Sequence, residues 1–277
     1  MGHQPFSVAI SVYKNDNSKF FDRALESITD SQTVKPDEIV LVVDGPVSEQ
    51  INEVISKYSA KYNFNVIHFE TNCGLGNALR IAVEKAKYDL IARMDSDDVA
   101  FNTRFEQQLR FFEANPSVDI IGGDISEFIG KEDNIVSFRT LPTSNDKIKR
   151  LAKRKCPFNH MTVMFRKAAV IKSGNYLDWH FNEDYFLWVR MIENNCFFAN
   201  TGTVLVNVRT GKGQFARRGG LKYFKSEKKL QKYMLQHHII SFPRYCINII
   251  GCFFVQCMLP NSLRSFFYKH FLRKKNV

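Results

Sequence analysis

The strongest constraint on the fold is a regular alternation of strand-like and helix-like segments over the first 94 residues. Short apolar runs rich in β-branched residues have the length of strands, at 6–12, 38–43, 65–69 and 90–94. Stretches with apolar residues at helical spacing separate them, at 20–30, 48–62 and 77–86. This order predicts a parallel sheet with right-handed crossovers and helices on both faces. Ligands of such sheets bind at the carboxyl ends of the strands.

The chain after residue 98 predicts further strands and helices in a less regular order. Strands are expected at 118–128, 135–140, 161–165, 196–200 and 204–208. Helices are expected at 102–114, 144–152, 185–192 and 222–237. We therefore expect a catalytic domain over 1–210, with a nucleotide-binding part at 1–98 and an acceptor part at 99–210, and a separate basic segment at 211–277.

Charge is distributed unevenly along the chain. Residues 209–277 carry 15 basic residues and one acidic residue, whereas residues 1–208 carry 24 and 27. Such a cationic segment predicts contact with an anionic partner, either a membrane surface or a nucleic acid. A composition of 44% hydrophobic and 24% charged residues excludes a wholly disordered chain. The six cysteines form no Cys-x-x-Cys pair, which favours reduced thiols, and the first residues show no secretion signal.

The apolar stretch at 239–259 is the strongest candidate for membrane contact. Its most apolar part, 246–259, is shorter than the roughly 20 residues that span a bilayer. The residues that follow mix Phe266, Phe267 and Phe271 with lysine and arginine. This pattern favours amphipathic helices lying on an anionic leaflet. A helix pair that packs on the catalytic body is the alternative.

A run of acidic residues, Asp95-Ser96-Asp97-Asp98, directly follows the strand expected at 90–94. Two carboxylates one residue apart can bind Mg²⁺ or Mn²⁺ while a ligand diphosphate completes the coordination shell. An isolated acidic turn is more often a solvated loop, but the end of a parallel strand is where ligands bind. We therefore interpret this turn as a candidate site for a metal and a diphosphate.

Other polar residues follow the neighbouring strands and are expected at the same edge. Asp44 ends the second strand and can accept a hydrogen bond from a base or a ribose, and Ser11 and Tyr13 end the first. The candidates for binding phosphate are Asn72, Gly74, Arg80 and Arg93. The glycines at 74 and 76 do not complete a dinucleotide-binding Gly-x-Gly-x-x-Gly pattern. A turn cap or a core side chain is the alternative for each residue taken alone.

Two later pairs of residues carry chemistry suited to an acceptor. Glu183 and Asp184 open a helix, where one carboxylate could remove the proton of an acceptor hydroxyl and where caps are also common. Asn159 and His160 precede a short strand and could contact an acceptor or a metal, with a structural histidine as the alternative.

Together these motifs resemble the family 2 glycosyltransferases over residues 6–210. The resemblance is carried by Ser11-Val12-Tyr13, Val43-Asp44-Gly45, 72–80, 92–98 and Asn182-Glu183-Asp184. It is closest to bacterial capsular and exopolysaccharide enzymes of the amylovoran-transferase type, in which a segment like Pro157-Phe158-Asn159-His160 recurs. The resemblance implies a GT-A fold, a nucleotide-diphosphate sugar donor, a divalent metal (Mn²⁺ or Mg²⁺) and inversion at the anomeric carbon.

The resemblance also implies a role for individual residues. Asp44 resembles the acid that contacts uracil, and Arg93, Asp95 and Ser96 line the nucleotide side. Asp97 resembles the metal ligand, Asp184 the catalytic base and Glu183 its neighbour. The Gln-x-x-Arg-Trp motif of processive synthases is absent, which predicts transfer of a single sugar. Arg217 and Arg218 are expected to contact the donor diphosphate.

The expected partners are the UDP-linked or other nucleotide-sugar donor and a saccharide acceptor linked to polyprenyl diphosphate. An anionic membrane surface is expected rather than a nucleic acid, with the enzyme in the cytoplasm, peripheral on the inner face of the cell membrane. The sequence leaves the oligomeric state open. A nucleotidyltransferase, a haloacid-dehalogenase-type phosphatase and a non-catalytic membrane or nucleic-acid binder remain as alternatives.

Overall fold

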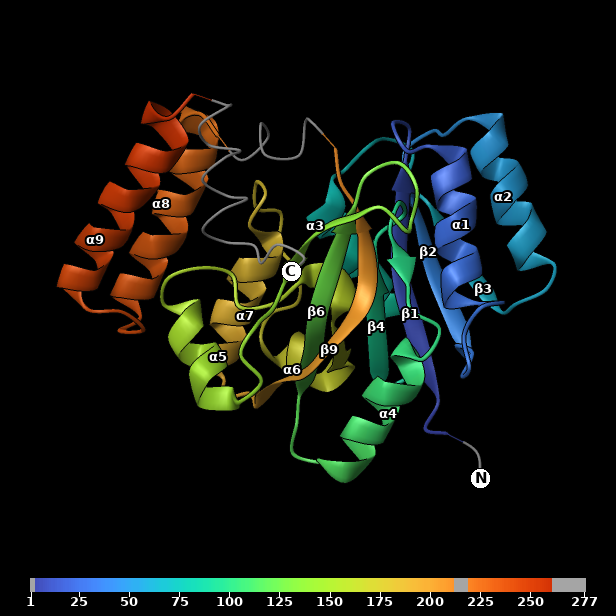
Figure 1. The fold of residues 1–277 in the computed structure, drawn as a ribbon, viewed down its shortest axis with the longest axis horizontal. Helices are drawn as coiled ribbons and strands as arrows, with labels where there is room; N and C mark the ends of the chain where they lie inside the picture. Colours follow the sequence, from blue (N-terminus) through green and yellow to red (C-terminus); the bar gives the residue numbers. More distant parts are fainter. Residues whose placement is uncertain (1–2, 212–218, 261–277) are drawn as a thin grey trace.

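A computed structural model of the chain describes residues 3–211 and 219–260 (Figure 1). In these residues, one sheet of nine strands forms the centre, with helices on both of its faces and a pair of helices at one end. The strand order is β3-β2-β1-β4-β8-β6-β9-β5, with β7 paired to β6.

The first half of the sheet is parallel, as the alternation of strands and helices predicts. It comprises β1 (Phe6–Tyr13), β2 (Glu38–Asp44), β3 (Phe64–His68) and β4 (Leu90–Met94). Alternate residues of these strands face opposite sides, because side chains of a strand repeat every two residues. Val8 and Ile10 therefore lie in one hydrophobic core, and Ala9 lies in the other.

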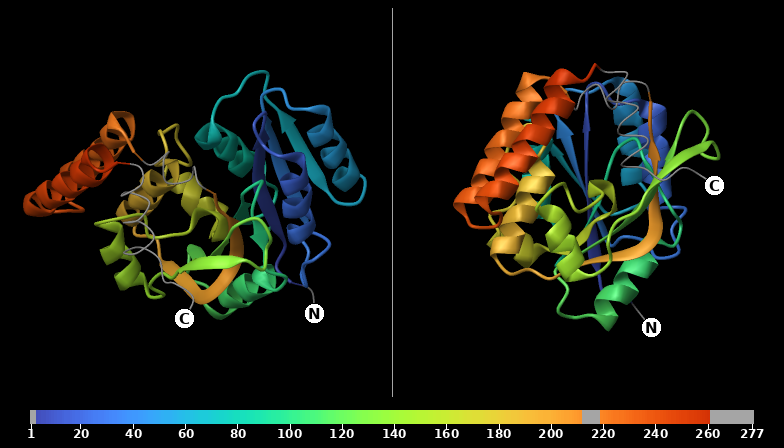
Figure 2. Two further views of the ribbon diagram at one scale, coloured as in Figure 1. Left: turned by 45° about the horizontal axis from the view of Figure 1, so that its top comes forward. Right: turned by 60° about the vertical axis from the view of Figure 1, so that its left-hand side comes forward.

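Helices cover each side of this parallel half. On one face lie α1 (Ser18–Ile28) and α2 (Glu49–Ser59), and on the other lies α3 (Leu75–Lys85) (Figure 2). The apolar positions of α1, such as Phe21 and Leu25, are fully buried against the sheet. Helical spacing in the sequence therefore predicts correctly that Phe21 and Leu25 enter the core.

The second half of the sheet is mixed. It comprises β5 (Val99–Ala100), β6 (Ile120–Phe128), β7 (Ile135–Arg139), β8 (Met164–Arg166) and β9 (Phe198–Arg209). Only β6 and β9 run parallel here, and β8 joins the two halves by antiparallel pairing with β4 and β6. The two strands expected at 196–200 and 204–208 form the single strand β9, and β5 was not predicted.

All but one of the described helices of this half lie close to their predicted positions. They are α4 (Arg104–Ala114), α5 (Asn145–Ala152), α6 (Lys167–Lys172) and α7 (Glu183–Glu193). The sequence did not predict α6. Part of the strand expected at 161–165 is instead a 3₁₀ turn at His160–Thr162.

The C-terminal helices α8 (Leu221–Gln236) and α9 (Phe242–Phe253) lie side by side at one end of the molecule, and α9 continues as a π-helical turn at Phe254–Met258 (Figures 1 and 2). Leu230 and Met234 of α8 form a buried cluster with Tyr185, Phe186 and Val189 of α7. This contact packs α8 on the body, and Ile240, in the stretch expected at 239–259, joins the same cluster. Among the described residues, no helix combines the length and apolarity that crossing a bilayer requires.

Candidate active site

The carboxyl ends of β1, β2 and β4 meet at one edge of the sheet. Tyr13 at the end of β1 pairs in register with Asp44 at the end of β2. On the other side of β1, Ile10 pairs with Met94, the last residue before the acidic turn. The structure therefore brings Ser11, Tyr13 and Asp44 to the edge from which the acidic turn begins, as parallel pairing predicts.

Asp44 is buried and holds the loop that leads into α3. Its Oδ1 accepts a hydrogen bond from the backbone N of Cys73 (2.6 Å), and its Oδ2 accepts from the backbone N of Gly74 (3.0 Å) and from Nδ2 of Asn72 (2.8 Å). Gly45 fits here because its φ is +84° and an added Cβ would lie 2.8 Å from the backbone N of Asn72. Asp44, Asn72 and Gly74 thus form one unit, and their contact with a nucleotide stays a prediction.

Asp16, in the loop after β1, is an acidic residue of this site that our sequence analysis missed. Its Oδ2 accepts hydrogen bonds from Oγ of Ser96 (2.9 Å) and from the backbone N of Tyr13 (3.0 Å). Burial raises the pKa of Asp16 above its usual value. Its position just beyond the end of β1 is a signal that could have identified it, because loops at these strand ends line the ligand site.

The acidic turn concentrates negative charge. The carboxylate of Asp97 is largely surrounded by protein although the residue is exposed, and this burial, with the charges of Asp95 and Asp16, raises its pKa to about 6. Asp98 is buried, and burial together with Asp95 and Asp97 raises its pKa well above the usual range. Its Oδ1 accepts a hydrogen bond from the backbone N of Arg209 (2.9 Å), which fixes the end of β9 to the turn.

These carboxylates fit a divalent cation that a diphosphate also coordinates. Burial and the charges of Asp95 and Asp16 raise the pKa of Asp97, and a bound cation would relieve the repulsion between these carboxylates. In the described part of the chain, no three histidine, cysteine or acidic side chains converge to form a complete protein cage. Mg²⁺ commonly binds through one or two carboxylates and the phosphates of a substrate, so Asp97, with Asp95 beside it, suits such a shared site.

Arg93 connects the acidic turn to the second group of carboxylates. Its guanidinium is 2% exposed and forms an ion pair with Asp95 through Nη2, while Nε and Nη1 find no hydrogen-bond partner among the described residues. The charges of Arg93 and Asp95 both act on Glu183, at the start of α7. The turn and the Glu183–Asp184 pair therefore belong to one electrostatic site, although they are far apart in the sequence.

Glu183 and Asp184 have different surroundings. Burial and the neighbouring Asp184 charge raise the pKa of Glu183 to about 8, so that it is mostly protonated at neutral pH. Oδ1 of Asp184 accepts a hydrogen bond from the backbone N of Tyr185 (2.6 Å), and Oδ2 accepts from Sγ of Cys156 (3.4 Å). Burial and the Asp184 charge raise the pKa of Cys156 well above its usual range, so the thiol keeps the proton that it donates.

The ring of His160 lies 6.0 Å from that of Trp188 on α7, and Asn159 is held by the fold. Nε2 of His160 is 2.9 Å from the hydroxyl of Tyr176, and burial with the charge of Arg93 lowers its pKa well below the usual value, which keeps it neutral. Asn159 is 1% exposed and donates a hydrogen bond to the carbonyl of Gly123 (2.8 Å). The structure gives Asn159 a structural contact, and acceptor binding by either residue stays a prediction.

Of the remaining predicted cations, the structure describes Arg80 alone. Nη1 of Arg80 forms an ion pair with Glu84 on α3 (3.1 Å), and the pair is partly exposed. Arg217 and Arg218 lie outside the described residues. Arg209, which the sequence analysis did not select, donates from Nε to the carbonyl of Asp97 (3.1 Å) and stacks on the ring of Phe20.

Comparison with known proteins identifies the family. The sequence model described as "Glycosyl transferase family 2" matches residues 7–174. A "UDP-Gal:alpha-D-GlcNAc-diphosphoundecaprenol beta-1,3-galactosyltransferase" of Escherichia coli is 36% identical over 269 residues, which cover 97% of each chain. The "Amylovoran biosynthesis glycosyltransferase AmsE" of Erwinia amylovora is 40% identical over 232 residues, covering 83% of this chain and 85% of that protein.

Solved structures share the fold at lower identity. The S. aureus TarS fragment 1–349 in complex with UDP-GlcNAc has a TM-score of 0.68 and 19% identity, covering 94% of this chain and 76% of that one. The mannosyltransferase PcManGT from Pyrobaculum calidifontis, in complex with GDP-Man and Mn²⁺, has a TM-score of 0.65 and 13% identity, covering 95% and 72%. The predicted GT-A-type α/β fold is confirmed, and the chain belongs to glycosyl transferase family 2 and is a glycosyltransferase.

Proposed function

We propose that this enzyme transfers one sugar from a nucleotide-diphosphate sugar, UDP-linked, to a saccharide on polyprenyl diphosphate during the synthesis of a surface polysaccharide. The observation that carries the proposal is the gathering of the acidic turn, Arg93 and the ends of β1 and β2 at one edge of the sheet, where the charges of Arg93 and Asp95 also act on Glu183. The name of the E. coli relative specifies a UDP-galactose donor and an acceptor on diphosphoundecaprenol, and the TarS fragment binds UDP-GlcNAc.

The donor occupies the strand-end edge in this proposal. The nucleoside lies against Ser11, Tyr13 and the Asp44 loop, and the diphosphate faces the acidic turn. Asp97, assisted by Asp95, would hold Mn²⁺ or Mg²⁺ at this edge. When bound, the cation offsets the negative charge that develops on the departing diphosphate. The buried guanidinium of Arg93 keeps the carboxylate of Asp95 in place through their ion pair.

Asp184 acts as the general base in a single inverting displacement. The acceptor oxygen forms a bond to the anomeric carbon while the bond from that carbon to the phosphate oxygen breaks, and the nucleoside diphosphate leaves with the electron pair. The hydroxyl proton passes to Asp184, whose orientation is set by Cys156 and the N–H of Tyr185. Glu183 holds its own proton at neutral pH and so does not compete as a base.

The decisive experiment combines ligand binding and product analysis. In a screen of nucleotide sugars, one donor should raise the melting temperature of the protein, and the rise should be larger with Mn²⁺. The reason is that a ligand that binds only the native state stabilises it. With that donor and a lipid-linked saccharide, the products should be a nucleoside diphosphate and an extended saccharide. Release of pyrophosphate would instead indicate a nucleotidyltransferase.

Variants test the proposed roles of the two aspartates. Asp97→Asn and Asp184→Asn should each lower turnover by about 10³-fold or more, in the range of losses seen when catalytic groups are removed. Asp97→Asn should also lose the effect of Mn²⁺ on donor binding, whereas Asp184→Asn should keep it. Asp133→Asn, at an exposed position between β6 and β7, is the matched control. Turnover near that of the wild type in either active-site variant would disprove the assigned role.

A further inference from the structure

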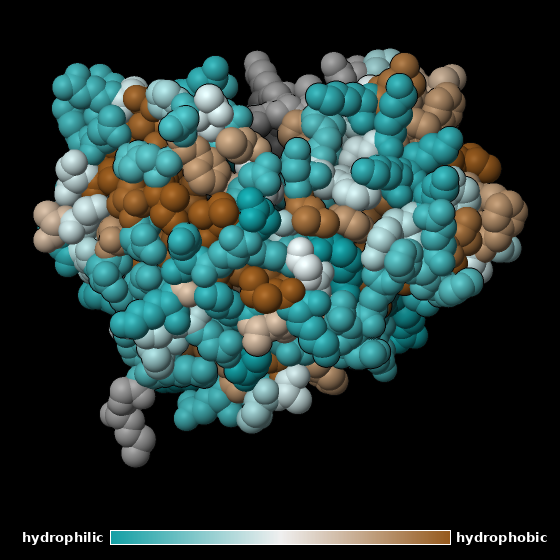
Figure 3. Space-filling model, turned by 180° about the vertical axis from the view of Figure 1, so that it is seen from behind, coloured by the Kyte–Doolittle hydropathy of each residue, from teal (hydrophilic) through white to brown (hydrophobic). Residues whose placement is uncertain are grey.

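Helix α9 leaves its apolar side chains exposed. The structure buries no side chain of α9, and Ile250 at 70% and Phe242 at 65% are among the most exposed large apolar residues described. Single exposed apolar residues are common on proteins, but a contiguous group marks a contact surface. Seen from behind in Figure 3, apolar residues lie among hydrophilic ones along the edge of the molecule formed by α8 and α9.

The exposed residues share one face of the helix. Ile247, Ile250, Phe254 and Met258 follow one another at intervals of three or four residues, which places them on the same side. We call these four residues the outer face of α9. The opposite side is engaged, because Nδ2 of Asn248 donates to Oε1 of Gln231 (2.8 Å) and to the carbonyl of Lys153 (2.9 Å). These contacts hold α9 on the rest of the protein without using the residues of the outer face.

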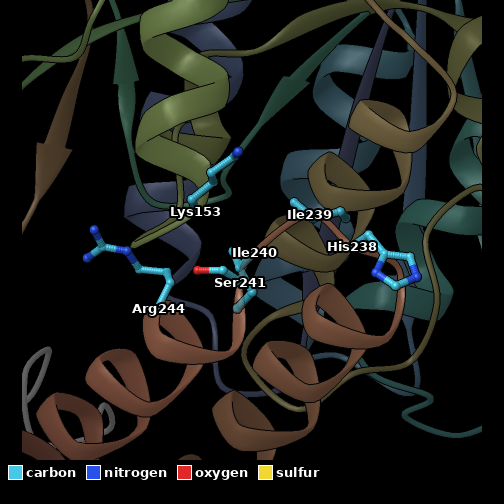
Figure 4. Close-up of a pocket in the computed structure, with 6 residues that line it drawn as sticks. All are labelled: Lys153, His238, Ile239, Ile240, Ser241 and Arg244. Carbon is cyan, nitrogen blue, oxygen red and sulfur yellow. The ribbon is translucent and has the colours of Figure 1, made fainter.

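Positive charge gathers at the start of α9 and along α8. A cavity of about 380 Å³ at the start of α9 is lined by Lys153, His238 and Arg244 together with residues 239–241 (Figure 4). Neither Lys153 nor Arg244 forms an ion pair with an acidic side chain of the described chain. The five lysines of α8, at 222, 225, 228, 229 and 232, are exposed.

This part of the chain offers no exposed carboxylate to balance these cations. Residues 209–277 contain one acidic residue, Glu227, and its side chain is buried beside Gln231. The sequence after the described region, 261–277, adds five basic residues and no acidic one. The described cations at the start of α9 and on α8 are therefore complementary to an anionic surface.

We infer that the outer face of α9 docks into an anionic phospholipid leaflet, with Lys153, Arg244 and the lysines of α8 close to the lipid phosphates. An apolar helix face inserts among the acyl chains near the headgroups, and basic side chains add attraction to anionic lipids. Two copies of so cationic a surface would repel each other. The reason for such docking rests on the proposed function, because docking would bring the catalytic edge close to a lipid-linked acceptor.

The test is binding of the full chain to vesicles, which requires no turnover. Wild type should sediment with vesicles of phosphatidylcholine containing 30% phosphatidylglycerol, and at least tenfold less with phosphatidylcholine alone. The variant Ile247→Ser/Ile250→Ser/Phe254→Ser should lose at least tenfold in partitioning, and Lys153→Gln/Arg244→Gln should lose a smaller factor that disappears in high salt. The control Ile129→Ser/Val136→Ser/Ile171→Ser removes exposed apolar residues elsewhere and should bind like the wild type.

Other outcomes would overturn the inference. They are sedimentation of the triple α9 variant at the wild-type level, equal binding to neutral and anionic vesicles, or no vesicle binding by the wild type. A dimer in solution that the α9 variant abolishes would make the outer face an interface between copies. The single variant Ile250→Glu, with an unchanged melting temperature, covers the case in which the triple variant misfolds. Transfer to a water-soluble acceptor analogue should be the same in the wild type and in all α9 variants. If the wild type shows no such transfer, the proposed function fails, and the vesicle result still decides the docking inference.

Discussion

Replacing Asp44 by asparagine separates a structural role of this residue from a role in binding. In the structure, the two carboxylate oxygens accept from the backbone N–H groups of Cys73 and Gly74 and from the side chain of Asn72. The asparagine side chain has only one acceptor oxygen, so at least one of these hydrogen bonds is lost. Its NH₂ group then faces one of the N–H groups that Asp44 accepted from. Hydrogen bonds to a charged group contribute about 1.5–3 kcal/mol each.

Water can replace part of this loss, because Asn72 and Cys73 are exposed. We therefore expect Asp44→Asn to lower the free energy of unfolding by about 2–3 kcal/mol, which corresponds to a fall in melting temperature of about 4–10 °C for a chain of this size. Thermal unfolding followed by circular dichroism measures the shift, and calorimetric titration with the nucleotide measures affinity.

Asn72→Ala provides the matched comparison, since it removes only one of the three hydrogen bonds to the carboxylate. Its melting temperature should fall by about 2–4 °C, or roughly 1 kcal/mol. If Asp44→Asn leaves the melting temperature unchanged while abolishing nucleotide binding, then the hydrogen bonds to the loop do not stabilise the fold and the reasoning fails.

Two further predictions concern the pair at the start of α7. Because burial and Asp184 raise the pKa of Glu183 from 4.5 to about 8, the folded protein retains a proton that the unfolded chain releases, so stability should fall as pH rises from about 5 to 8. Glu183→Gln removes this contribution, so the melting temperature of the variant minus that of the wild type should be larger at pH 8.5 than at pH 5. An equal difference at the two pH values would contradict the assigned pKa shift. Cys156→Ala should lower kcat about tenfold without changing the KM for the donor, because Asp184 loses a donor that orients it, and Cys156→Ser should restore most of the rate. Initial rates of nucleoside diphosphate release measure this, and wild-type turnover in Cys156→Ala would show that the thiol does not orient the base.

The sequence predicted the parallel half of the sheet and the edge at which the site lies. Its strands and helices are local patterns, since apolar residues repeat every two or every three to four positions along neighbouring stretches of chain. The strand ending at Met94 therefore sufficed to place the acidic turn, and the position of Glu183 and Asp184 at the start of a helix was also predicted.

Local patterns failed where pairing partners far away in the sequence set the structure. Two strands were expected at 196–200 and 204–208, yet β9 runs through the residues between them, and its register against β6 shifts between Gly122 and Asp124. The two residues of β5 are too few to carry a periodic signal, and they are a strand only because β9 pairs with them.

The residue types at the site were thus determined by the sequence, whereas their partners were decided by the tertiary structure. Nothing in the order of residues shows that Asp16 bonds to Ser96, or that the thiol of Cys156 meets Asp184. Nor does it show which face of α9 remains uncovered. Periodicity depends on neighbours a few positions apart, but pKa values, hydrogen bonds and exposure depend on groups that only the packing of distant segments brings together.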